Sequence, residues 1–156
     1  MFFFILHYFF QKKITAGFFY RLLSFRGVRC AFHPWVWDAL IPMKHRTFLW
    51  LAFWDRLNTR SNMVKKQWTT IAPTADCDLC PALETIHHII LRCRAATALW
   101  TRLLLAPLAC RSTDLISFVQ QAAPQLEFKR KWNVAFAACA ITLWQARNDR
   151  IFNSRS

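Results

Sequence analysis

Residues 77–93 read CDLCPALETIHHIILRC, and this stretch holds three of the six cysteines of the chain and two of its five histidines. Cys77 and Cys80 are separated by only two residues, and a third cysteine, Cys93, follows the histidine pair. Six cysteines allow three disulfides in a secreted protein, but a Cys-x-x-Cys pair with histidine nearby is typical of metal binding in a reducing compartment. We therefore expect these residues to organise the fold around a metal ion.

Zinc is the metal that this donor set favours, because it takes four tetrahedral sulfur and nitrogen ligands. Two thiolates on a tight turn can fill two corners while backbone amides hydrogen-bond to the sulfurs. A short helix from Glu84 can then present one histidine, with Cys93 at its end. His88 and Cys93 are five residues apart, which is about 140° around an ideal α-helix, so we expect Cys93 at or just beyond the helix end.

The choice between the two histidines rests on the apolar pattern. If Ile86 and Ile90 face the core, His88 lies next to that face and His87 lies further round towards solvent. We favour His88 as the ligand and keep His87 as the alternative. A neutral histidine and three thiolates leave the zinc site with a net charge of −1, which Arg92 and Arg94 can offset.

The resulting pattern is Cys-x₂-Cys-x₇-His-x₄-Cys. It differs from the retroviral zinc knuckle, which has four residues between its second cysteine and its histidine. Four protein ligands leave no open coordination position for an activated water, so the metal is expected to stabilise the fold and not to catalyse. The alternative is a set of buried or redox cysteines without metal.

Charge indicates the partner. The 156 residues carry 21 Lys and Arg against 8 Asp and Glu, a formal net charge of +13. Such an excess favours a polyanion, with nucleic acid first and an acidic membrane second. The alternative is a solubilising surface on an apolar protein, or drift without selection. The candidate nucleic-acid contacts are Lys65, Lys66, Arg92, Arg94, Lys129, Arg130 and Lys131.

Hydrophobic periodicity predicts a mainly α fold, a small helical domain organised around the Cys₃His site. The expected helices are 42–57, 60–67, a short one from residue 84, 95–105, one capped by Asp114 up to residue 123, and 127–152. The first is apolar all round, which predicts a buried helix. Thr59 is expected to cap the second, and Pro107 to end the helix that starts at residue 95.

The last helix is expected to supply core residues and not a base-stacking platform. Its apolar positions recur at helical spacing, with Cys139 as a small buried hydrophobe and not a ligand. The expected core positions are Trp132, Ala135, Phe136, Cys139, Leu143 and Trp144.

Residues 1–10 are almost wholly apolar and precede Lys12 and Lys13. The run is shorter than the ~20 residues that a membrane span needs, and its charges follow the apolar run where a signal peptide would have them first. We expect an intracellular protein, nuclear or cytoplasmic, with no membrane partner; a signal anchor in residues 1–10 is the alternative.

Several further stretches resemble a known family. They are Trp37, IPMK at 41–44, FLWL at 48–51, RLNTRSN at 56–62, the cysteine cluster, Trp100, and WQARNDRIF at 144–152. In this order they resemble the zinc-binding domain of plant non-LTR retrotransposon reverse transcriptases, over residues 19–153. The resemblance implies the ligands Cys77, Cys80, His88 and Cys93, with His87 where an acidic residue is common.

The resemblance also implies domain limits and a context. Residues 1–18 would be a lead-in, and residues 19–153 the zinc-binding domain, with its zinc core at about 35–105 and a long C-terminal helix at about 127–152. Such domains follow a polymerase domain, and an RNase H domain often comes after them. The apolar start and the early stop are departures that suggest a fragment or a decayed copy.

We therefore expect a non-catalytic accessory module that binds Zn²⁺ and nucleic acid, either element RNA or target DNA. The eight acids lie singly or beside the cysteines, unlike a two-metal carboxylate site, so we expect no enzyme and no small-molecule substrate. One alternative is a structural module that docks on a reverse transcriptase polymerase domain through Trp35, Trp37 and Trp54. A hydrolase that uses Cys77 or Cys93 with His87 as base has little support.

Overall fold

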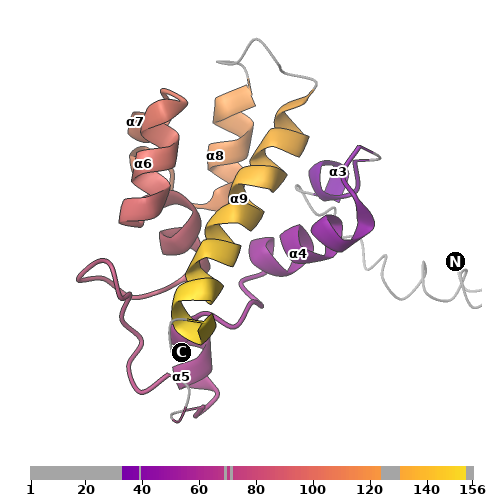
Figure 1. The fold of residues 1–156 in the computed structure, drawn as a ribbon. Coiled ribbons are helices and arrows are strands. Elements are labelled where there is room, and N and C mark those ends of the chain that lie inside the picture. Colours follow the sequence, from indigo (N-terminus) through magenta and orange to yellow (C-terminus); the bar gives the residue numbers. More distant parts are fainter. Residues whose placement is uncertain (1–32, 39, 69, 71, 124–130, 154–156) are drawn as a thin grey trace, which may run out of the picture. The chain divides into compact units, whose positions relative to one another are not determined.

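The computed structural model describes residues 33–38, 40–68, 70, 72–123 and 131–153, all within the second of two compact units, residues 31–156. This part of the chain is mainly helical, as predicted (Figure 1). Its only β-type pairing is an antiparallel bridge between Asp76 and Leu83. The helical elements are α3 (His33–Val36), α4 (Met43–Phe53), α5 (Arg60–Lys65), the π-helical turn η1 (His88–Arg92), α6 (Arg94–Arg102), α7 (Ala106–Arg111), α8 (Leu115–Ala122), α9 (Trp132–Asn148) and the π-helical turn η4 (Asp149–Asn153).

Helix α9 is the long element on which this unit is assembled, and it contacts α4, α6 and η1 (Figure 1). At its N-terminal half, Trp132 and Phe136 join Trp100 of α6 and Phe118 of α8 in one aromatic cluster, with ring centroids 4.9 to 6.4 Å apart. All four side chains are buried. The prediction that the aromatic residues of the last helix form core is confirmed for Trp132 and Phe136.

The buried stripe of α9 differs in part from the expected one. It runs at spacings of four, four, three and four residues, through Trp132, Phe136, Ala140, Leu143 and Arg147, with Ala137 beside it. Ala135 is exposed, and Cys139 and Trp144 are only half-buried, so these three positions were wrongly assigned to the core. The error arose because only apolar residues were assigned to the buried stripe. The residue that continues the stripe towards the C-terminus is Arg147.

Three helices end in the same way, although the whole chain has only two glycines. After α4, α5 and α6, a non-glycine residue adopts the left-handed conformation, with φ of 50° at Asp55, 60° at Gln67 and 59° at Leu104. The next residue then donates its amide to a carbonyl five positions back, as when Leu105 N–H bonds to the Trp100 oxygen at 2.8 Å. This is the Schellman arrangement, in which glycine is usual.

These endings correct two predicted helix boundaries. Helix α4 ends at Phe53 with the turn at Asp55, four residues earlier than predicted. Helix α6 ends at Arg102, and Pro107 does not end it but lies in the first turn of α7, a helix that was not predicted. Proline suits that position because its missing amide would have no helical partner there.

Helix α4 is not the buried element that its composition predicted. Leu49 and Ala52 are buried, but Met43 is 62% exposed and Leu51 36% exposed. The helix packs against α3 and α9, and a helix that contacts neighbours on part of its surface leaves its remaining apolar residues outside. No helix of the described part of the chain combines the length and the apolar character needed to cross a membrane.

The predicted caps are confirmed. Thr59 Oγ1 accepts the Asn62 amide at the start of α5, and Asp114 forms a reciprocal capping box with Ser117 at the start of α8. Predictions for residues 1–18 and for Lys129 and Arg130 fall outside the described residues.

Candidate metal centre

The four predicted ligands lie together. One ligand atom from each of Cys77, Cys80, His88 and Cys93 lies within 4.8 Å of the others. Cys93 Sγ is 3.9 Å from both Cys77 Sγ and Cys80 Sγ. Zinc–sulfur bonds of ~2.3 Å in a tetrahedron would separate two sulfurs by about 3.8 Å, so the spacing fits zinc.

The first two ligands are held by a tight loop. The bridge between Asp76 and Leu83 closes its base, and inside it Cys77 N–H bonds to the Ala82 oxygen at 2.9 Å. The backbone amide of Leu79 donates to Cys77 Sγ, and that of Arg94 to Cys80 Sγ, both at 3.4 Å. These are the amide–sulfur hydrogen bonds expected of metal-binding thiolates.

The other two ligands come from the two ends of a π-helical turn. Thr85 Oγ1 accepts the His88 amide before the turn, and Cys93 N–H closes it on the His88 oxygen at 2.7 Å. Cys93 itself has extended backbone angles and is the N-cap residue of α6, so the prediction that it lies just beyond the preceding helix is confirmed. The π turn was not predicted. A bond between residues five apart aligns His88 and Cys93 on one side, which an ideal α-helix does not.

Position, and not burial alone, separates the two histidines. Both Nε2 atoms are buried without a hydrogen-bond partner, but only His88 lies in the ligand group. Burial is the main cause that lowers the pKa of His88, which keeps its imidazole neutral as metal binding requires. His87 interacts with the backbone of Ser112 instead.

Cys93 is the most deeply buried of the three cysteines, at 3% exposure. Burial, together with the neighbouring Cys77, raises the pKa of its thiol to about 11. A lone thiolate would therefore be unfavourable here at neutral pH, whereas a zinc ion would supply the compensating charge and displace the proton. Four protein ligands would leave such an ion no open coordination position.

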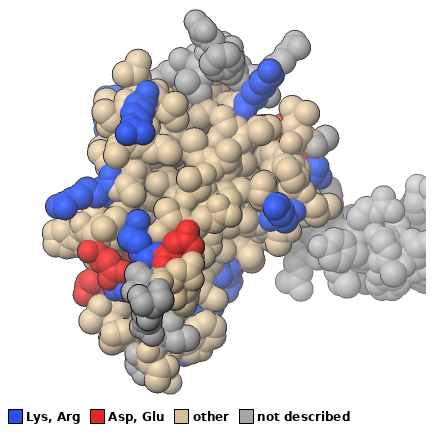
Figure 2. Space-filling model, in the orientation of Figure 1, with Lys and Arg blue, Asp and Glu red and all other residues tan. Residues whose placement is uncertain are grey.

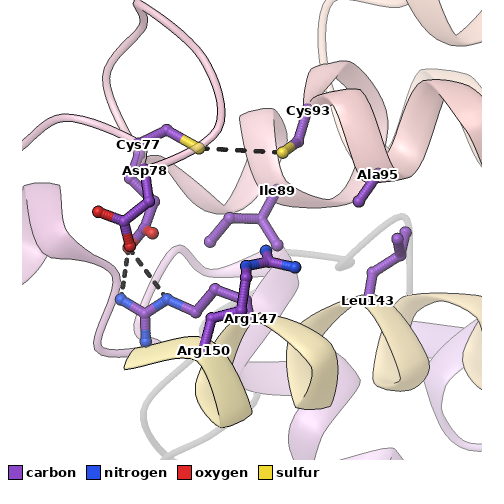
Figure 3. A pocket seen from close by; sticks show the side chains of 9 residues that line it. Cys77, Asp78, Ile89, Cys93, Ala95, Leu143, Arg147 and Arg150 are labelled. Atoms are coloured by element: carbon purple, nitrogen blue, oxygen red, sulfur yellow. Dashed lines mark hydrogen bonds and ion pairs between the residues drawn. The ribbon is translucent and has the colours of Figure 1, made fainter. Parts of the chain in front are cut away.

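The charges around the cluster come partly from an unpredicted source. Arg92 donates from its guanidinium to the Ser112 carbonyl at 3.2 Å, and Arg94 is exposed. Arg147 and Arg150, from the C-terminal end of α9 and from η4, line the cleft beside Cys77 and Cys93 (Figure 3). The sequence did not predict that these two arginines lie at the cluster, because they are more than 50 residues away from it along the chain. The only indication was the stretch at 144–152, which contains both of them.

A Cys₃His cluster inside a small helical unit defines a zinc-binding domain. The comparison with protein families agrees: the family described as zinc-binding in reverse transcriptase matches residues 15–100, more than half of the chain, which therefore belongs to this family. No curated protein and no solved structure gives a significant match. The matched segment contains all four ligands and ends at Trp100, so α7, α8 and α9 lie beyond it.

Proposed function

We propose that this chain is a non-catalytic, zinc-stabilised accessory module of a reverse transcriptase that binds nucleic acid through basic side chains. The zinc-binding family supplies the context, and a cluster of four possible protein ligands favours a structural role for the zinc. A polyanionic partner is favoured by the formal net charge of +13.

The observation that carries this proposal is how the candidate cations are bonded. Lys66 Nζ donates to the Asn58 side-chain oxygen at 2.8 Å, and Lys65 Nζ donates to the Asn62 side-chain oxygen at 3.4 Å. Arg92 donates to a backbone carbonyl. Neutral acceptors leave the positive charge uncompensated, so these side chains keep their attraction for phosphate.

The arrangement of charge favours several separate phosphate contacts. On the face shown in Figure 2, Lys and Arg side chains are spread over the surface with uncharged residues between them. The described candidates Lys65, Lys66, Arg92, Arg94 and Lys131 are all exposed. Separate contacts along a backbone bind RNA or DNA with little sequence preference and with a strong dependence on salt.

The test is binding of labelled single-stranded RNA and duplex DNA to the zinc-loaded chain over a series of salt concentrations. The logarithm of the affinity should fall linearly with the logarithm of the salt concentration. Lys65→Gln/Lys66→Gln and Arg92→Gln/Arg94→Gln should each reduce the slope by about 1 to 2, roughly one for each lost phosphate contact.

The matched control is Lys44→Gln/Arg102→Gln, which removes the same charge from exposed positions on α4 and α6. Zinc content is measured for every variant, because Arg92 and Arg94 flank a ligand. Affinity that is insensitive to salt would overturn the proposal. So would a control pair that lowers the slope as much as the candidate pairs do.

A second candidate function, docking on a polymerase domain, is favoured by the exposed apolar side chains of α3 and α4 and the turns beside them. Trp37 is 39% exposed, Leu40 62%, Met43 62% and Trp54 47%, whereas Trp35 is half-buried. Apolar patches of this kind mark protein interfaces. Nuclease-insensitive capture of a reverse transcriptase polymerase domain, lost in Met43→Ser/Trp54→Ser, would support docking; capture that persists in that variant would exclude this face.

A further inference from the structure

Glu84 directly follows the loop of residues 75–83 that carries Cys77 and Cys80, which we call the metal loop. Its carboxylate is buried, with the residue only 2% exposed. Its backbone amide bonds to the Ala75 oxygen at 2.8 Å, which secures the end of the loop against its beginning. Its Oε1 accepts the Arg60 backbone amide at 2.8 Å, at the start of α5. It also accepts the Arg147 side chain through Nε at 3.1 Å and through Nη2, in a buried ion pair.

Arg60 extends this network to the residues on either side of the first ligand. Its guanidinium donates to the Asp76 carbonyl at 3.1 Å and to the Asp78 carboxylate at 2.7 Å. Cys77 lies between these two acceptors. Glu84 therefore fixes the backbone of Arg60, and the side chain of Arg60 fixes the loop around Cys77.

Arg147 brings α9 into the same network. It is 3% exposed, and its guanidinium also packs over the Trp144 ring, 5.0 Å from the centroid. In Figure 3, Arg147 and Arg150 extend from the C-terminal segment towards the loop that carries Cys77 and Asp78. A buried ion pair adds little net stability compared with apolar packing, whereas its fixed geometry can orient the segments that it joins.

We propose that Arg147 is a positioning residue for the zinc site, acting through Glu84 and Arg60 on the loop that holds Cys77 and Cys80. Helix α9 is then part of the metal-binding unit, although it lies beyond the segment that matches the family. The coupling is reciprocal: zinc that orders the loop also stabilises the docking of the C-terminal end of α9.

The test measures zinc affinity by competition with a chromophoric chelator, and site geometry by the absorption of the cobalt-substituted protein. Arg147→Met should weaken zinc binding by about 10- to 100-fold, the range typical for groups that orient metal ligands. Arg102→Met, an exposed arginine on α6, is the matched control and should bind zinc like the wild type. Equal affinities of these two variants would overturn the proposal.

Two further variants separate positioning from general stability. Glu84→Leu/Arg147→Met replaces the ion pair with apolar residues, a change that often preserves stability. It should fold but still bind zinc weakly, because no acceptor remains for the Arg60 amide; zinc affinity at the wild-type level would overturn the proposal. Arg147→Lys keeps the buried positive charge but cannot reproduce the two hydrogen bonds that Nε and Nη2 donate to Glu84 Oε1. It should lower the zinc affinity several-fold. An unchanged affinity in this variant would also overturn it.

Discussion

The two ends of α9 are held in place by different interactions. At the N-terminal end, Trp132 and Phe136 pack with Trp100 and Phe118, all of them buried. At the C-terminal end, Arg147 pairs with Glu84, which directly follows the metal loop, and no residue of that loop, 75–83, is buried. The aromatic end is stabilised by apolar area, whereas the loop has no core of its own. Its order must come from the metal, the backbone bonds and the Glu84 network.

The largest expected effect comes from removing a metal ligand. His88→Ala should abolish stable zinc binding, and His87→Ala should leave zinc content unchanged, because only His88 lies with the three cysteines. Metal analysis of both purified variants is the measurement. Loss of zinc from the His87 variant alone would reverse the assignment.

Removal of zinc should also affect the regions at the two ends of α9 to different extents. Backbone hydrogen exchange after chelation should rise first in residues 77–93, because the binding energy of a structural zinc is largely folding energy for the segment that holds it. The aromatic cluster should remain protected for longer. Simultaneous loss of protection at both ends would show that they fold as one cooperative unit.

A substitution in the aromatic cluster should lower the stability of the fold and leave zinc binding unchanged. Phe136→Ala removes a ring that stacks on Trp100 and is 2% exposed, which should cost about 3 to 5 kcal/mol of unfolding free energy. Urea denaturation of the zinc-loaded protein measures it. Zinc stoichiometry of the folded variant should be unchanged, because the ring contacts of Phe136 are with other aromatic residues. A variant that folds but has lost its zinc would contradict the separation of the two ends.

The sequence predicted what depends on local chemistry. Ligand spacing identified the cluster, and the hydroxyl and carboxylate at Thr59 and Asp114 correctly marked helix starts. It did not predict the π turn between His88 and Cys93, because helical periodicity assumes a regular helix. The pairing of Glu84 with Arg147 depends on tertiary contact between distant segments.

Helix endings were missed for a different reason. The first helix was expected to run to residue 57 and the helix from residue 95 to end before Pro107, yet the chain turns at Asp55 and Leu104. Leucine is disfavoured in the left-handed region, so nothing in the local sequence indicates a turn at Leu104. Backbone hydrogen bonds and the packing of the neighbouring helices outweigh that cost.

A cap beside the aromatic cluster should contribute a smaller amount. Asp114→Ala removes the acceptor of the Ser117 amide, at 2.8 Å, and should cost about 1 kcal/mol at neutral pH. The Ser117 backbone hydrogen bond lowers the pKa of Asp114 below 3.8. Stabilisation from a carboxylate with a lowered pKa is present above the unfolded value and lost as the pH falls through the folded one. The difference in thermal stability between wild type and variant should therefore narrow below about pH 3.8; a constant difference would contradict the role of the charge.

The smallest effect tests the connection between the two regions, and it is a gain. Leu104 is 86% exposed with φ of 59°, between α6, which begins at the metal site, and α7. Leu104→Gly should raise the unfolding free energy by roughly 0.5 kcal/mol, because glycine adopts this conformation without steric cost and that gain exceeds the chain entropy that glycine adds to the unfolded state. Leu103→Gly is the control. Leu103, the C-cap residue that follows α6, has a φ of −94°, where glycine relieves no strain and should destabilise. If both substitutions destabilise equally in urea denaturation, the turn at Leu104 carries no strain, and the helix ends are set by packing alone.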